Sequence, residues 1–142
     1  MSSAPQPAPS IDVEHLKMIQ SVVDRLAQNS FATKNWSVGL ITAILAFSTV
    51  TQKAPTAVLA FFPAICFGAL DVFYLRQERL FRALYRAASM GQAPSFSMDT
   101  SPFKDQNTGV VSVVRSPAVW LVHGAIITVI MLVVLAATIL TS

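Results

Sequence analysis

Charged residues are scarce in this chain of 142 residues. Asp, Glu, Lys and Arg make up only 12% of it, whereas about a quarter of an average soluble domain is charged. Small domains usually need about 25–35% charged residues on their surface to stay soluble. Since 54% of the residues are hydrophobic, the composition excludes an ordinary soluble enzyme and indicates a membrane protein.

Cysteine and histidine are also scarce. The single cysteine, Cys66, excludes an internal disulfide framework and a cysteine-based zinc site, because both need several cysteines. The two histidines, His15 and His123, lie far apart in the sequence, and there is no HExxH, GxSxG or P-loop motif. We therefore expect no catalytic residue, no metal site and no cofactor, and we predict that the protein is not an enzyme.

Long uncharged segments are what the chain does contain. Charge-free windows cover residues 35–52 and 54–70, apolar residues continue to position 75, and no charge follows Ser116. A helix needs roughly 20 apolar residues to cross a hydrocarbon core of about 30 Å. We predict an all-α membrane protein with three transmembrane helices, at residues 35–52, 54–75 and 117–141, of which the first is near the lower limit of length.

The region before the first predicted span is polar. Residues 1–10, MSSAPQPAPS, lack basic residues, which is typical of a disordered tail and not of a signal peptide. Residues 11–33 are predicted to form an amphipathic cytoplasmic helix, with Ser10 as N-cap and acidic residues in its first turn. This helix could lie on the lipid headgroups or pack against a partner helix. Its apolar stripe consists of Leu16, Ile19, Val23 and Leu26.

A basic segment follows the second predicted span. Residues 76–90 are predicted to continue that helix as a basic juxtamembrane helix, in which Glu78 pairs with Arg82. Its arginines would contact anionic lipid headgroups, at about 1 kcal/mol each. We expect no nucleic-acid binding, because the aromatic residues lie on the opposite, apolar face. The candidate headgroup contacts are Arg76, Arg79, Arg82 and Arg86.

The polar linker and the distribution of basic residues complete the layout. Residues 91–115 are predicted to form a cytoplasmic linker, in which Phe96 and Met98 could pair with the valine run at 110–114 as a small β-hairpin. Nine basic residues lie before the first span or between 76 and 115, and Lys53 alone lies in the turn between the first two spans. The positive-inside rule therefore places the N-terminus in the cytoplasm and the C-terminus outside.

Small residues recur at steps of four in the first two predicted spans. They are Gly39 and Ala43 in the first span, and Ala60, Ala64 and Gly68 in the second. Small residues let helices approach closely in lipid, so these could pack the hairpin or mediate self-association. Because three helices enclose no lumen by themselves, we predict a homo-oligomer.

Two ionisable residues lie within the predicted spans. Asp71 is near the cytoplasmic end of the second span, and His123 is about two turns into the third. At this shared depth Asp71 could accept a hydrogen bond from His123 or from an arginine. Ionisable groups within a membrane serve in proton relays, ion paths or gating, and they also tie helices together. The sequence leaves both roles open for this candidate polar pair.

Two segments carry a resemblance to known proteins. HLKMIQSVVDRLAQNSFATKNW before the first span and LDVFYLRQERLFRALY after the second resemble those of small bacterial inner-membrane proteins, a family with no settled activity. The resemblance covers most of the chain and implies a multi-pass protein of the bacterial inner membrane. The layout is also similar to SLATT-type membrane effectors of bacterial defence systems, which are proposed to form pores. That similarity is one of arrangement, and the third span departs from it.

Two functional classes follow from these observations. The first is a homo-oligomeric structural or interaction component, which presents its basic cytoplasmic surface to anionic lipid or to a cytoplasmic protein partner. The alternative is a pore-forming or membrane-disrupting effector of an anti-phage defence system. Few polar residues are available to line a pore, namely Ser37, Thr42, Ser48, Thr128 and Thr138.

Overall fold

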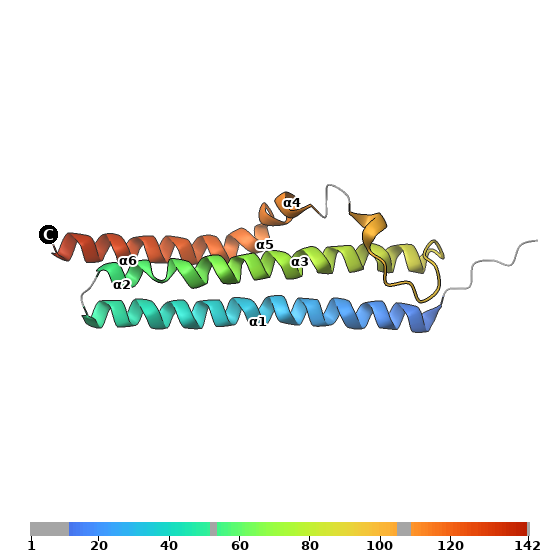
Figure 1. Ribbon diagram of the computed structural model, residues 1–142, viewed down its shortest axis with the longest axis horizontal. Helices are drawn as coiled ribbons and strands as arrows, with labels where there is room; N and C mark the ends of the chain where they lie inside the picture. Colours follow the sequence, from blue (N-terminus) through green and yellow to red (C-terminus); the bar gives the residue numbers. More distant parts are fainter. Residues whose placement is uncertain (1–11, 52–53, 105–108, 142) are drawn as a thin grey trace, which may run out of the picture.

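The described chain is an elongated assembly of helices. A computed structural model describes residues 12–51, 54–104 and 109–141, and its longest helices lie side by side (Figure 1). They are α1 (Val13–Thr51), α3 (Phe61–Ser89) and α6 (Ala125–Thr141). No β-strand is present in these three ranges. The predicted all-α class is therefore confirmed for this part of the chain.

Short helical elements extend or connect the long ones. α2 (Ala54–Val58) leads into α3, while α5 (Pro117–Val119) and a π-helical segment, η2 (Trp120–Gly124), lead into α6. The linker contains a 3-10 turn, η1 (Ser101–Phe103), and a short helix, α4 (Val110–Val114). The predicted β-hairpin is therefore wrong. The valine run is helical, which buries Val113 completely, and such tertiary burial overrides the β-propensity of valine.

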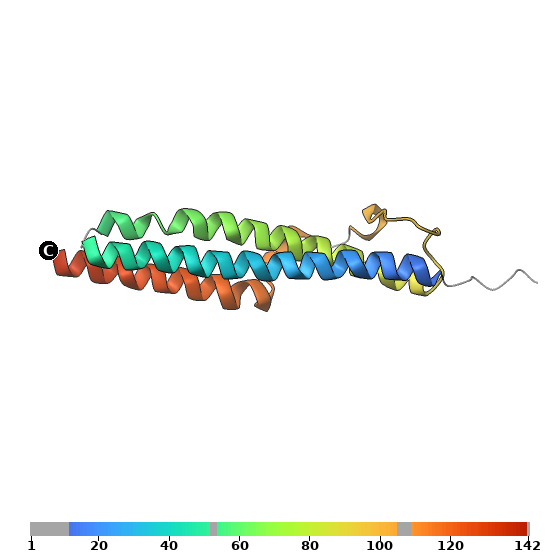
Figure 2. The same cartoon turned by 90° about the horizontal axis from the view of Figure 1, so that it is seen from below.

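The molecule has a three-helix half and a two-helix half. Figures 1 and 2 both show α1, α3 and α6 together near the C-terminus, whereas only α1 and α3 continue to the opposite end. α1 has 39 residues, and a helix of that size is about 58 Å long, far more than a bilayer core requires. The predicted cytoplasmic helix and first span are thus one continuous helix. α3 likewise carries the second predicted span into the basic segment without interruption.

The core of the three-helix half combines small and branched residues. α1 contributes Ile41 and Leu45, and α6 contributes Ile130, which is fully buried. The stretch through α2 and α3 contributes alanines, which let the other two helices approach its backbone closely. The members on that side are Ala57, Ala60 and Ala64.

A second core closes the two-helix half. Ile19 and Val23 of α1 pack with Leu84 and Ala88 of α3, and linker residues cover them. The ring nitrogen Nε2 of His15 lies 2.8 Å from the carbonyl oxygen of Ser97, which fastens the linker to α1. The amphipathic part of α1 thus packs against a helix, which is one of the two predicted alternatives, and that helix is α3 of the same chain. The covering residues are Ala93, Met98 and Phe103.

The start of α1 differs from the prediction by a few residues. The side chain of Asp12 accepts hydrogen bonds from the backbone N–H groups of Glu14 and His15, at 3.1 and 3.2 Å. Asp12 is therefore the N-cap, because its carboxylate satisfies donors that the helix itself leaves free. Ser10 and the predicted tail at 1–10 lie outside the described residues.

Two helical runs in the described part of the chain are long and apolar enough to cross a membrane. They are Pro55–Ser89 and Pro117–Ile139, and large apolar side chains such as Phe62 and Leu121 are exposed on them. The first predicted span, within α1, is not one of these runs. Its apolar stretch is interrupted by polar side chains, including those of Asn35, Ser37 and Thr42.

The stability of the two-helix half depends on Leu84 in the second core. We expect Leu84→Ala to lower the free energy of unfolding by about 2–5 kcal/mol, because Leu84 is fully packed and its loss leaves a cavity. Urea denaturation in detergent micelles, followed by circular dichroism, measures this effect. The control Met18→Ala changes an exposed residue of α1 and should stay within about 0.5 kcal/mol of the unchanged protein. Equal effects of the two substitutions would contradict the packing described.

Candidate functional site

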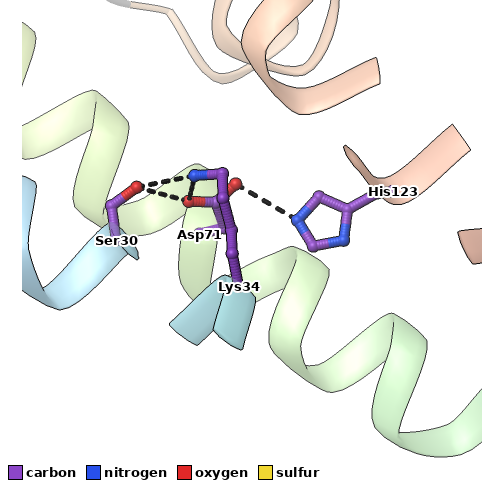
Figure 3. Close-up of polar contacts among 4 residues, drawn as sticks. All are labelled: Ser30, Lys34, Asp71 and His123. Carbon is purple, nitrogen blue, oxygen red and sulfur yellow. Dashed lines mark hydrogen bonds and ion pairs between the residues drawn. The ribbon is translucent and has the colours of Figure 1, made fainter. Parts of the chain in front are cut away.

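A buried carboxylate lies where three helical segments meet. Asp71 of α3 has no solvent exposure, and Figure 3 shows it surrounded by Ser30 and Lys34 of α1 and by His123 of η2. Its Oδ1 accepts hydrogen bonds from the Ser30 hydroxyl at 2.6 Å and from Lys34 Nζ at 2.5 Å. Its Oδ2 lies 3.1 Å from Nε2 of His123. Since a carboxylate can only accept, His123 presents Nε2–H to it.

Helix geometry explains how α1 supplies two of these groups. Ser30 and Lys34 are four residues apart, so they lie on the same face of α1. Lys34 Nζ also donates to the Ser30 hydroxyl at 2.8 Å. α1 and α3 are antiparallel, and Lys34 and Asp71 are nearly equidistant from the turn that joins the two helical runs. Hairpin register therefore brings the lysine to the carboxylate.

The third segment brings His123 through an irregular helix. η2 is π-helical, and such segments are rare and frequently found at functional sites because they redirect side chains. Gly68 of α3 lies beneath the imidazole, where a Cβ would be 3.7 Å from Nδ1. Because glycine has no side chain, the His123 ring can lie close to the backbone of α3.

Electrostatics make this cluster a single unit. An unpaired buried charge costs several kcal/mol, whereas Asp71 has a cation, a hydroxyl and an imidazole as partners. The Lys34 side chain keeps 18% of its surface exposed, so the cluster reaches solvent through the lysine. Removing Asp71 leaves the Lys34 ammonium without its counter-ion and the Nε2–H of His123 without its acceptor.

Two polar atoms beside the cluster have no hydrogen-bond partner among the described residues. They are Nδ1 of His123 and the hydroxyl of Ser37, which is fully buried. Ser37 is one turn from Lys34 along α1, and Gly68 is one turn from Asp71 along α3, both toward the turn of the hairpin. Ser37 and Gly68 are therefore at the same level, and Gly68 lies against the ring of His123.

The structure brings together some of the predicted site residues. Asp71 and His123 are in contact, and the cation that pairs with Asp71 is Lys34 and not an arginine. Sequence reasoning missed Ser30 and Lys34, although the antiparallel register of the predicted hairpin contained the signal for the lysine. The Glu78–Arg82 ion pair is present at 2.6 Å, and its arginine is largely exposed.

The two sets of small residues have different surroundings. Ala60 and Ala64 are buried in the three-helix core, and Gly68 faces His123. Gly39 and Ala43 are exposed, and a Cβ on Gly39 would meet nothing within 4 Å. Gly39 and Ala43 therefore do not pack the hairpin, because α1 places Ile41 and Leu45 in the core instead.

Other chemistry is sparse in the described residues. No group of three or more His, Cys, Asp or Glu side chains is placed to hold a metal ion there. A groove of about 270 Å³ between α1 and α6 is lined almost entirely by apolar side chains, with Thr42 as the polar exception. The groove offers no group for acid-base or nucleophilic chemistry.

Comparisons with known proteins add no relative to this description. No protein-family model, no curated protein and no solved structure matches the chain.

The Asp71 cluster predicts a strong energetic coupling. Asp71→Asn leaves the Lys34 charge without its counter-ion, and we expect it to lower the free energy of unfolding by about 3–5 kcal/mol. The double substitution of Asp71→Asn with Lys34→Met should cost less than the sum of the single changes. Urea denaturation of all four proteins in micelles gives the coupling energy.

The exposed pair of α3 supplies the matched control for that cycle. Glu78→Gln removes the partner of Arg82, whose side chain is mostly exposed, and should cost at most about 1 kcal/mol. Additive effects of the Asp71 and Lys34 substitutions would show that the two side chains do not act as a unit.

Proposed function

We propose that this chain is an integral protein of the bacterial inner membrane that crosses it three times and acts as a homo-oligomeric structural or interaction component. One observation carries the proposal. α1 and α3 run without interruption from the half with apolar exposed surfaces into a half held by its own core. A cytoplasmic helical hairpin is thereby joined rigidly to the spans.

Exposed tryptophans support the proposed position of the membrane. Trp36 is 72% exposed and Trp120 is 61% exposed, and both are within a few residues of members of the Asp71 cluster. Tryptophan is enriched at membrane–water interfaces, so this level fits the cytoplasmic boundary. In this arrangement the first span is residues 35–52 of α1. The N-terminus and the 76–115 segment lie in the cytoplasm, and the C-terminus lies outside.

This boundary limits which arginines contact lipid. Along α3, Arg76 is about 8 Å beyond Asp71 and Arg86 about 22 Å beyond it, at 1.5 Å per residue. Headgroup regions are only about 5–8 Å thick, and surface charge is screened within about 8 Å. Arg76 and Arg79 are thus the candidates for anionic headgroups. Arg82 and Arg86 lie farther along the hairpin and suit a cytoplasmic partner with acidic groups.

The proposed oligomer uses the exposed small residues of α1. Gly39 and Ala43 lie away from the core residue Ile41 on α1, at membrane depth. A surface of small residues lets a second helix approach closely in lipid. Self-association of copies of this chain is the use that fits these two positions.

The pore-forming alternative receives less support from the hydroxyl groups. Ser37 and Ser48 are buried within a single chain. Thr128 and Thr138 donate to carbonyl oxygens of their own helical run, at 2.9 and 2.8 Å. Thr42 lies in a groove whose other lining residues are apolar. These groups would contribute little polarity to a channel between copies, so we favour the structural or interaction role and propose no enzymatic activity.

Cysteine labelling tests the proposed topology. In a Cys66→Ser background, Lys53→Cys should react with a membrane-impermeant maleimide in intact cells, because the turn between the first two spans is outside. Met18→Cys, an exposed position on α1, should react only after the membrane is permeabilised. Labelling of both sites in intact cells, or of neither, would rule out three spans with this orientation.

Substitution of the exposed glycine tests the oligomer. We expect Gly39→Leu to weaken self-association at least about tenfold, or 1.4 kcal/mol, because the larger side chain separates the helices. Energy transfer between labelled chains in bilayers, at a series of protein-to-lipid ratios, measures this change. The fold should persist, since the position is open within the chain. Leu40→Ala is the control on another exposed part of α1, and equal effects of the two variants would count against the proposed interface.

A further inference from the structure

His123 uses only one of its two ring nitrogens in the cluster. Nε2 faces Asp71 at 3.1 Å, while Nδ1 points away from it and is buried without a partner among the described residues (Figure 3). A buried imidazole nitrogen without a hydrogen bond is costly in either charge state, as a free lone pair or as a free N–H. This nitrogen therefore requires an explanation.

Ser37 is a buried polar group at the same level of the bundle as that nitrogen. Its hydroxyl is fully buried and also unpartnered among the described residues, at the level of Gly68, over which the imidazole lies. A hydroxyl both donates and accepts, so it can pair with Nδ1 whether or not the nitrogen carries a proton. One water between Ser37 and Nδ1 would do the same, since both groups are polar and adjacent to a residue without a side chain.

We propose that Nδ1 of His123 is a proton-binding site, reached from the N-terminal face of the bundle, whose occupancy controls how tightly the third span is held to the hairpin. The proposal rests on the membrane arrangement of the proposed function. Histidine is the side chain whose charge ordinarily changes between about pH 5 and 8, which suits it to this role.

The proton transfer involves no other chemical change. A hydronium ion gives its proton to the Nδ1 lone pair and becomes water, while Nε2–H remains on Asp71. The Ser37 hydroxyl, which has no partner among the described residues before the transfer, turns to accept from the new N–H. Asp71 and Lys34 keep their charges, so the cluster changes from no net charge to one positive charge.

The charged groups around His123 determine the effect of this proton. α3 presents Asp71 and α1 presents Lys34, whereas α2, which also packs on the third helical run, has no titratable side chain. The new positive charge is attracted by Asp71 but repelled by Lys34 in a poorly hydrated site. Because His123 pairs with Oδ2 of Asp71 and Lys34 with Oδ1, protonation turns the His123–Asp71 hydrogen bond into a charge-assisted one, and we expect the third span to be held more tightly to the hairpin.

Lys34 is the partly exposed member of the cluster, with 18% of its side-chain surface exposed, and we place the entry of protons on that side. On the other side of Ser37 the core continues with Ile41, Ala64 and Ile126, whose side chains neither bind nor release protons. Protons can therefore enter and leave by the same face, and the arrangement is a sensor of pH on that face and not a path across the membrane.

Tryptophan fluorescence provides the test, because Trp120 is in the same π-helical segment as His123. Trp36→Phe leaves Trp120 as the remaining tryptophan of the two. In proteoliposomes we expect its emission maximum to shift between about pH 8 and pH 5 when the pH changes on the N-terminal face alone. The shift should be lost in His123→Gln and kept in His15→Gln, which changes the other buried histidine.

Nuclear magnetic resonance of the ring nitrogens gives a second measurement that needs no substitution. The His123 resonances should show uptake of about one proton per chain over the same range. Ser37→Ala should change this titration, because the protonated Nδ1 then lacks an acceptor. A His123 ring that stays in one charge state overturns the proposal, and so does an emission shift that survives in His123→Gln or that follows the pH of the opposite face. An unmoved titration in Ser37→Ala overturns the role of Ser37.

These readouts separate the proposal from the proposed function. Sidedness is defined by the N-terminal face of the chain, which protease cleavage identifies in the proteoliposomes. The same titration can be followed in Gly39→Leu. Loss of self-association or a reversed orientation in cells would contradict the proposed function while leaving the His123 measurement intact. If His123 showed no titration in a correctly oriented oligomer, only the proposed proton site would be overturned.

Discussion

The burial of Asp71 is the constraint on which the rest of this structure depends. A carboxylate without solvent contact is stable only if cations and donors surround it, and here each of the other two helical segments supplies some of them. Lys34 and Ser30 fix the register of α1 against α3, and His123 fixes the depth of the third segment. Apolar packing holds the helices together, but it would tolerate sliding that the polar contacts prevent.

The two halves of the molecule follow from this junction. On one side of it the helices expose large apolar side chains and are packed through alanines, as suits lipid. On the other side α1 and α3 form a separate core, which the linker covers through Met98 and Phe103. Because neither long helix is interrupted at the junction, α1 and α3 join the two halves continuously.

The sequence predicted the helices better than their contacts. Charge-free windows and the 3.6-residue period identified the helical runs, because hydrophobicity and periodicity are local properties. The valine run at 110–114 was misjudged because β-propensity is weaker than the burial of Val113. Spacing alone could not reveal that Gly68 faces a neighbour and Gly39 does not, since the small residues of both spans recur at the same step of four.

By itself, the sequence determined that this protein is helical and poor in charge, and it predicted that Asp71 and His123 lie at a similar level. Only the tertiary structure decided that Lys34 pairs with Asp71 and that Gly39 is exposed. It also decided that His123 lies in a π-helical segment, from which it reaches Asp71 of α3. The physical reason is that register and rotation between helices depend on contacts distant in sequence. The scarcity of charged residues can be read from the sequence, but which charged residues pair with one another cannot.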